Sequence, residues 1–133
     1  MIQKIIYTAL FVDNPSELIQ LFSPKHSNVF AHHSTIAFRP FSLEGIEVGK
    51  KLKLKVLGRA CDEKGDALLV EKYKTVNTHP HITLSCVENI APSYSKELLE
   101  SAFEKGFIEM FDEPVEISVT EGFFDGISDV TSL

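Results

Sequence analysis

Lys51-Leu52-Lys53-Leu54-Lys55-Val56 alternates strictly between basic and apolar side chains. Successive residues of a β-strand point to opposite faces, so this stretch predicts a strand with one buried face and one basic, solvent-exposed face. The strand is expected to run over residues 51–60. A turn at Asp62-Glu63-Lys64-Gly65 separates it from a second apolar stretch, residues 67–73. Together they predict a β-hairpin at the centre of the chain.

Two helices and further strands are expected on either side of this hairpin. Asn14 is a good N-cap, Pro15 suits the first helical position and Glu17 falls three residues after the cap, so a short helix is expected from Pro15. A second helix is expected over residues 92–105, with Gly106 as its C-terminal cap. The remaining segments are expected to be strands at 5–12, 29–38, 81–86, 107–111 and 115–124, a loop at 41–49 and a frayed end at 125–133.

This order of elements predicts an α+β fold with a largely antiparallel sheet. No linker, low-complexity tract or long run of charge divides the chain, so residues 1–133 are expected to form one domain. The two halves resemble each other, because each contains a strand–helix–strand unit and a strand that carries histidine.

The composition limits the classes of function. With 13 basic and 19 acidic side chains, the formal net charge is −6. Proteins that bind long nucleic acids usually carry a basic face, so we expect no long duplex nucleic acid as a partner. Two cysteines are too few for a disulfide scaffold, and no apolar run is long enough to span a membrane. The first apolar stretch lacks a small-residue cleavage site and is interpreted as a strand, which favours a cytoplasmic protein without a membrane partner.

Two similar tetrapeptides stand out: His33-Ser34-Thr35-Ile36 and His81-Ile82-Thr83-Leu84. In each, His and Thr are two positions apart on an expected strand and therefore project from the same face. Histidine serves as an acid or a base near neutral pH, and a threonine hydroxyl can donate to a phosphate oxygen. The alternative is structural: two pairs of half-buried strand residues whose polar tips bond to the backbone.

The two tetrapeptides resemble the duplicated His-x-Thr-apolar motif of the two-histidine phosphoesterase superfamily. Residues 79–86 (HPHITLSC) are similar to its Pro-His-apolar-Thr-Leu segment, and residues 33–38 (HSTIAF) to its His-x-Thr-apolar-x-Phe segment. The resemblance extends to the first strand, the central hairpin and, more weakly, the last strand. It implies a compact relative of the RNA 2′,3′-cyclic phosphodiesterases, with a bilobal fold in which two mostly antiparallel sheets flank a central cleft and helices lie outside.

The resemblance also implies the roles of the motif residues. His33 and His81 would act as general acid and general base, and the hydroxyls of Thr35 and Thr83 would bind the substrate phosphate. Which histidine is the acid and which is the base stays open. The chain departs from longer members of the superfamily in two ways. The motif histidines are 48 positions apart, closer than in those members, and no helix is expected after Pro40.

Four other residues bear on the expected site. Arg39, Tyr7 and His79 are expected as possible substrate contacts. His32 would point away from His33 on a regular strand, so we interpret it as a surface or supporting residue. A metal site at His79 and His81 is the alternative, but it needs further ligands and no carboxylate stands at tight spacing. We therefore expect no metal and no cofactor.

These observations predict a metal-independent phosphodiesterase that acts on a 2′,3′-cyclic phosphate at an RNA end or on a nucleotide. The first alternative is a phosphodiesterase that degrades a cyclic di- or oligonucleotide signal. The second is a nucleotide-binding module without turnover. In each case the partner is a small nucleotide or an RNA end, and the protein is expected to be a monomer.

Overall fold

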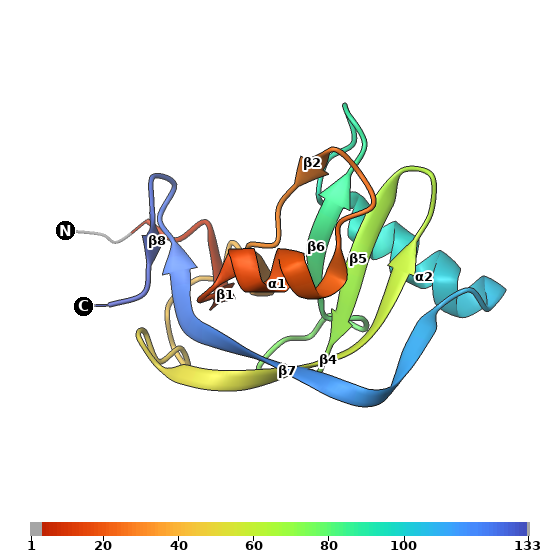
Figure 1. Ribbon diagram of the computed structural model, residues 1–133. Coiled ribbons are helices and arrows are strands. Elements are labelled where there is room, and N and C mark those ends of the chain that lie inside the picture. Colours follow the sequence, from red (N-terminus) through yellow and green to blue (C-terminus); the bar gives the residue numbers. More distant parts are fainter. Residues whose placement is uncertain (1–3, 133) are drawn as a thin grey trace.

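The computed structural model describes residues 4–132, and within this range six antiparallel strands close into a β-barrel. The strands follow the order β1-β3-β6-β5-β4-β7, and β7 completes the ring by pairing with both β4 and β1 (Figure 1). The barrel strands are β1 (Tyr7–Val12), β3 (His33–Phe38), β4 (Lys51–Cys61), β5 (Gly65–Val70), β6 (His81–Cys86) and β7 (Glu109–Phe124). Two short strands lie beside this ring: β2 (Asn28–Val29) pairs with β6, and β8 (Asp129–Val130) pairs with β7.

The expectation of a bilobal α+β fold with two sheets is wrong. One continuous sheet closes on itself, and the described part of the chain has only two helices, α1 (Pro15–Phe22) and α2 (Tyr94–Lys105). The reason lies in the length of β4 and β7, which pair with each other along β4 from Lys51 to Arg59. Each of these strands also pairs with a strand on its other side, β4 with β5 and β7 with β1. The two expected lobes are therefore joined in one ladder.

The strand β7 spans 16 residues, whereas the sequence predicted two strands interrupted at Pro114. The pairing of β7 with β4 shifts register between Val56 and Gly58, opposite residues 111–114. These residues leave the regular ladder, so the missing N–H of Pro114 costs no ladder hydrogen bond. Glycine at position 58 allows the close approach, because a Cβ atom there would lie 2.5 Å from the carbonyl oxygen of Glu109.

Both helices lie where the sequence predicted them. Asn14 caps α1 by accepting the N–H of Glu17 at 3.1 Å, and Pro15 is the first helical residue. Gly106 ends α2 in the left-handed conformation, with φ at 80°. Neither helix of the described chain is long and apolar enough to cross a membrane.

Two segments near the ends of the chain differ from prediction. The strand expected at 29–38 is split into β2 and β3, because Ala31 adopts a left-handed conformation with φ at 50° between them. The end expected to be frayed contains β8, where Val130 pairs with Phe123 of β7. Gly122 permits this pairing, because a Cβ atom there would collide with the carbonyl of Val130. Leu133 lies outside the described residues.

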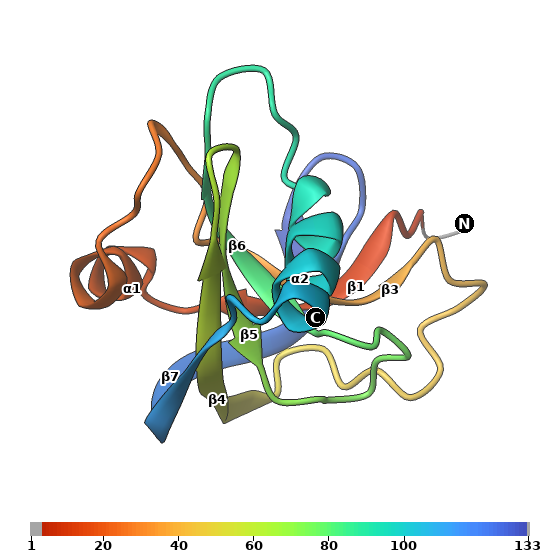
Figure 2. The same cartoon turned by 90° about the vertical axis from the view of Figure 1, so that its right-hand side faces the viewer.

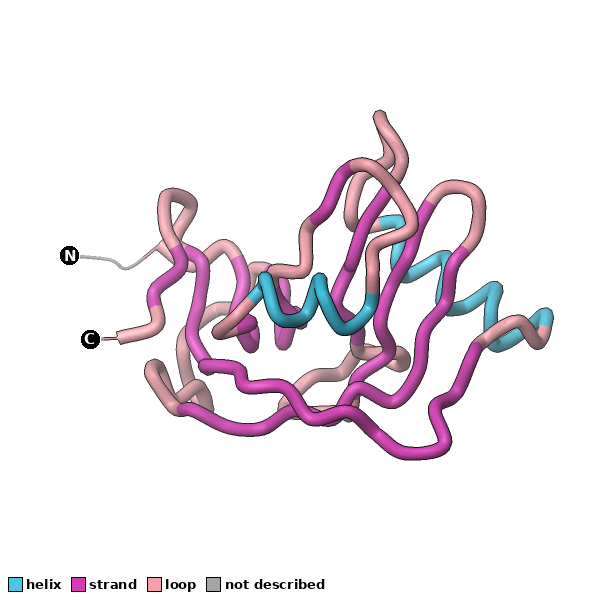
Figure 3. Tube along the Cα trace, in the orientation of Figure 1, coloured by secondary structure: helices cyan, strands magenta, loops and turns pink. Residues whose placement is uncertain are grey.

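Apolar side chains fill the barrel and also cover part of its outside. Alternate residues of each strand point inward, and α1 adds Leu18 to the same cluster. The buried strand residues of this interior cluster are Leu10, Ile36, Leu54, Val56, Leu68, Val70, Ile82, Leu84, Ile117 and Val119. The helix α2 packs against the outer face of the barrel, where Leu98 and Leu99 contact Leu69 and Ala67 of β5. Figure 2 shows α1 and α2 on opposite sides of β4 and β5. Figure 3 shows that most of the regular secondary structure is strand and that the helices are short.

The alternation in β4 predicts a difference between neighbouring substitutions. Leu54 is completely buried in the barrel, so Leu54→Ala should lower the free energy of unfolding by about 2–5 kcal/mol. Lys53 points to solvent on the same strand, and Lys53→Ala should change it by less than about 0.5 kcal/mol. Urea unfolding followed by circular dichroism measures both values. Equal effects of the two substitutions would contradict the assignment of Leu54 to the interior.

Candidate functional site

The two His-x-Thr motifs lie side by side where β3 meets β6. The two strands share one bridge, in which Ser34 lies opposite Ile82. Both of these residues are buried. The residues on either side of them therefore point to the outer face of the barrel. Across this antiparallel pair, each motif histidine becomes the neighbour of the threonine from the other motif.

A cavity of about 500 Å³ lies over this outer face. This size is within the usual range of small-molecule pockets. All four motif residues line the cavity, although their two motifs are far apart in the sequence. The lining residues are Tyr7, Val29, Phe30, His32, His33, Thr35, Phe38, His81, Thr83, Pro92 and Ser93.

The imidazole of His33 is packed against the ring of Tyr7 from β1. The two ring centroids are 4.6 Å apart and the planes differ by 19°. Burial and, to a smaller extent, the charges of His32 and His81 lower the pKa of His33 to about 4, although the Asp129 carboxylate opposes them. Burial raises the pKa of Tyr7 to about 12, with a further contribution from Asp129, so the phenol stays neutral at physiological pH.

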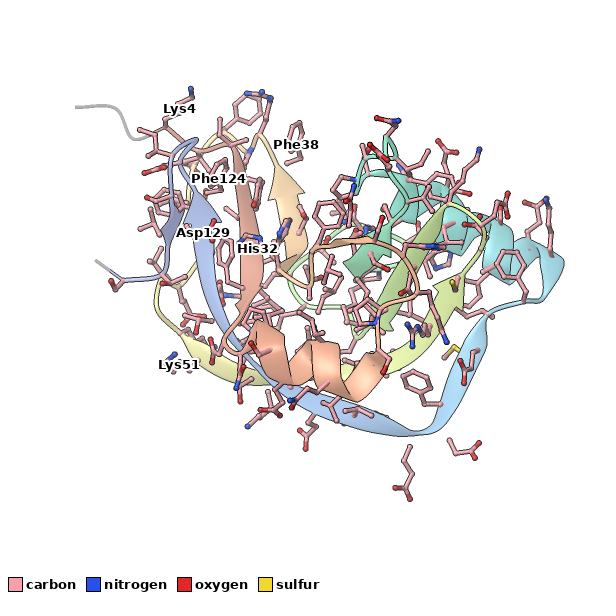
Figure 4. All side chains as sticks on the ribbon, turned by 45° about the horizontal axis from the view of Figure 1, so that its top comes forward. Lys4, His32, Phe38, Lys51, Phe124 and Asp129 are labelled. Atoms are coloured by element: carbon pink, nitrogen blue, oxygen red, sulfur yellow. The ribbon has the colours of Figure 1, made fainter. Side chains whose placement is uncertain are left out.

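His32 points toward His33, contrary to the prediction that it would point away. The Nδ1 atoms of the two rings are 2.7 Å apart, and Nε2 of His32 is 2.7 Å from Oδ2 of Asp129 in β8. Figure 4 shows the labelled His32 and Asp129 side by side. The strand alternation does not reach His32, because β3 begins at His33 and Ala31 has a left-handed backbone.

Asp129 was not predicted as a site residue, because it lies in the segment that was expected to be frayed. The signal that was available is the doublet of His32 and His33. Two adjacent histidines in front of a strand can meet when the preceding backbone turns. No comparable signal pointed to Phe30 or Ser93, which come from loops beside the strands.

The orientation of the His81 ring is fixed by the backbone just before β6. Its Nδ1 is 2.8 Å from the carbonyl oxygen of His79, an atom that only accepts hydrogen bonds. The proton of neutral His81 therefore lies on Nδ1, and Nε2 is the nitrogen that is left to act as a base. Burial lowers the pKa of His81, and the carbonyl of His79 partly opposes this effect.

The two motif threonines differ in how their hydroxyls are used. Thr83 Oγ1 donates to the carbonyl of Pro92 at 3.1 Å and lies 2.7 Å from Oγ of Ser95 in α2. Thr83 therefore joins β6 to the start of α2. The Thr35 hydroxyl has no partner among residues 4–132, and its side chain is half-buried at the cavity. Thr35 is the readier donor to a bound anion, because Thr83 must first exchange a partner.

Among the three further candidates for substrate contact, Tyr7 lines the cavity and the other two do not. Arg39 follows the end of β3 with φ at 48°, and its guanidinium carbon lies 5.2 Å from the ring centroid of Phe38. The His79 ring stacks on Phe103 of α2, with centroids 4.4 Å apart. His79 thus acts on the site through its backbone carbonyl. A substrate contact of the His79 ring stays a prediction, and so does a substrate contact of Arg39.

The described residues, 4–132, contain no group of three or more His, Cys, Asp or Glu side chains placed to hold a metal ion. His79 and His81, the pair considered in the sequence, do not converge on one point. His81 Nδ1 bonds to the His79 carbonyl, whereas the ring of His79 stacks on Phe103.

The different bonding of the two threonines predicts that they contribute differently to stability. Thr83→Val leaves the buried Ser95 Oγ without its partner and removes one of the two hydrogen bonds to Pro92 O, which keeps the N–H of Ser95. It should lower the free energy of unfolding by about 1–3 kcal/mol. Thr35→Val breaks no hydrogen bond between described residues and should change it by less than about 0.5 kcal/mol. Thermal and urea unfolding of the two matched variants test this. A larger loss for Thr35→Val would contradict the hydrogen bonding described above.

No protein-family model and no curated protein matches the chain. The likeness to two-histidine phosphoesterases therefore rests on the quoted motifs.

Proposed function

We propose that the protein is a phosphodiesterase that hydrolyses a 2′,3′-cyclic phosphate at an RNA end or on a nucleotide. One observation carries this proposal: two imidazoles from different strands line the same cavity, and each has its Nδ1 engaged by a neighbouring group. Each Nε2 has no partner among residues 4–132 and is left for chemistry. Two such nitrogens can supply both proton transfers that phosphodiester hydrolysis requires.

The reaction needs a base for the attacking water and an acid for the leaving ribose oxygen. Burial lowers the pKa of both His33 and His81, which favours the neutral form of each ring, so the acid must gain one proton before the reaction. The catalytic state has one proton to give and one bare nitrogen to receive. Thr35 can donate to a non-bridging phosphate oxygen and hold the phosphorus between the two rings.

The cavity favours a small substrate with an aromatic base. Its lining contains no lysine and no arginine, and the chain carries a net charge of −6. Both features disfavour binding of a long nucleic acid along its phosphate backbone. Phe30 and Phe38 provide aromatic surface at the cavity, and the side chain of Phe38 at the end of β3 is 67% exposed (Figure 4). Stacking of a base on an exposed aromatic ring is a common mode of nucleotide recognition.

The proposal includes a metal-independent mechanism, action as a monomer and a cytoplasmic location. Metal independence follows from the roles given to the two histidines, which already provide the acid and the base. A chelator therefore tests it directly.

The substrate and the two histidines are tested together by phosphorus NMR. Wild type in EDTA should convert a 2′,3′-cyclic nucleotide to a nucleoside monophosphate. His33→Ala and His81→Ala should each reduce the rate by about 10²–10⁴-fold, the usual value of a general acid or base. His26→Ala is the matched control, because His26 bonds to the carbonyl of Asp62 and does not line the cavity.

Three results would overturn parts of this proposal. Tight binding without turnover would make the protein a nucleotide-binding module. Loss of turnover in EDTA would exclude the metal-independent mechanism. Full activity in either histidine variant would remove that residue from the chemistry.

A further inference from the structure

Three side chains form a continuous hydrogen-bonded row at one side of the cavity, which His32 and His33 of this row line. Asp129 in β8 bonds to Nε2 of His32, and Nδ1 of His32 bonds to Nδ1 of His33, with both distances at 2.7 Å. The side chains of His32 and Asp129 are 43% and 36% exposed, whereas His33 is more deeply buried. The row therefore leads from solvent to the cavity.

The row constrains where its protons lie. The Asp129 carboxylate accepts only, so Nε2 of His32 carries a proton. Two ring nitrogens at 2.7 Å share one proton, because two bare nitrogens or two N–H groups would repel each other. When no extra proton is present, His33 holds the shared proton on Nδ1 and its Nε2 is bare. When the pair takes up one extra proton, Nε2 of His33 carries a proton toward the cavity and the charge can move to His32.

We propose that Asp129, His32 and His33 form a proton relay, in which Asp129 and His32 are positioning residues that make His33 the general acid and leave His81 as the general base. This inference rests on the proposed phosphodiesterase function. The geometry favours this assignment, because a carboxylate stands behind one imidazole and a neutral carbonyl stands behind the other. The carboxylate stabilises an extra proton on the pair of His32 and His33, whereas no anion does so at His81.

The titratable groups around His32 and His33 are consistent with this pair of rings holding one extra proton and not two. His33 faces Tyr7 from β1, His32 from the preceding segment, Asp129 from β8 and His81 from β6. Tyr7 has its pKa raised to about 12 and stays neutral. Burial and the charge of His32 lower the pKa of His33 to about 4, so His33 is not itself the cation near neutral pH. It carries the Nε2 proton as a neutral ring whose Nδ1 accepts the shared proton from His32.

The surroundings of His81 differ from those of His33. Its nearest titratable neighbour on the same segment is His79, and a second cavity that His81 also lines contains Lys96 and Glu100 of α2. Burial lowers the pKa of His81. The carbonyl of His79 holds the proton of neutral His81 on Nδ1, so its Nε2 is bare, as a general base requires.

In the proposed reaction, Nε2 of His81 takes a proton from water while the water oxygen forms a bond to phosphorus. The bond from phosphorus to one ribose oxygen breaks, and that oxygen receives the proton from Nε2 of His33. His33 regains a proton at Nδ1 from His32. One water is consumed, a nucleoside monophosphate leaves, and the proton on His81 returns to the relay through solvent.

The pH dependence of kcat/KM then has a stated sign. Activity rises with pH as His81 loses its proton, with a midpoint below its ordinary value of 6.5, and falls again as the relay loses its extra proton. Asp129→Asn removes a negative charge beside His32, so it should shift the falling limb to lower pH and reduce kcat by about 10-fold. Asp125→Asn is the matched control, because it removes the same charge in the same hairpin without contacting His32. It should leave both limbs unchanged.

The location of the protons is measured on the resting protein by ¹⁵N NMR of the imidazole nitrogens. At the pH of maximal activity we expect a protonated Nε2 on His33 and a bare Nε2 on His81. In a His32→Gln background, Asp129→Asn should have no further effect on the falling limb, because the relay is already cut. A bare His33 Nε2 beside a doubly protonated His81, or an unshifted limb in Asp129→Asn, would overturn the relay. Because NMR needs no substrate, absence of turnover would refute the proposed function separately.

Discussion

Ser34 and Ile82 face each other at the single bridge between β3 and β6, and the geometry of the cavity depends on this register. Side chains alternate along a strand, so a slip of β3 by one position would turn His33 into the barrel and expose Ile36, and a slip of β6 would do the same with His81 and Leu84. These two residues belong to the apolar interior, whose burial opposes such a slip. The packing of the barrel therefore fixes which side chains reach the cavity, although the histidines and threonines of the motifs do not belong to the interior cluster.

Closure of the sheet brings a third part of the chain to the same place. Because β7 pairs with β1, the chain end that follows β7 lies close to the segment in front of β3. The strand β8 folds back on β7 and places Asp129 against His32. The pairings β3–β6, β1–β7 and β7–β8 thus bring the segments that carry His32, His81 and Asp129 to the same part of the barrel. A barrel built from short-range hairpins alone would not bring them together.

Much of the local structure could be predicted from the sequence, because its signals are local. Asn14, Pro15 and Gly106 define helix ends, and the alternation from Lys51 fixes a strand and its buried face. The His-x-Thr spacing also predicted correctly that each motif presents both side chains on one face. Closure could not be predicted in this way, since it depends on pairings between residues about 100 positions apart. Pro114 was interpreted as a strand break. The register shift that accommodates it depends on the pairing of β7 with β4, which the sequence of β7 alone does not reveal. The orientation of His32 depends on the left-handed backbone of Ala31, which a non-glycine residue seldom adopts.

Under the proposed function, the cavity between the two motifs binds a phosphate attached to a nucleoside. A crystal structure of the protein with the reaction product, a nucleoside 2′- or 3′-monophosphate, tests this. The phosphate is expected to lie between Nε2 of His33 and Nε2 of His81 and to accept a hydrogen bond from Thr35, with the base against Phe30 or Phe38. A phosphate bound elsewhere, or a cavity that stays free at saturating nucleotide, would contradict it.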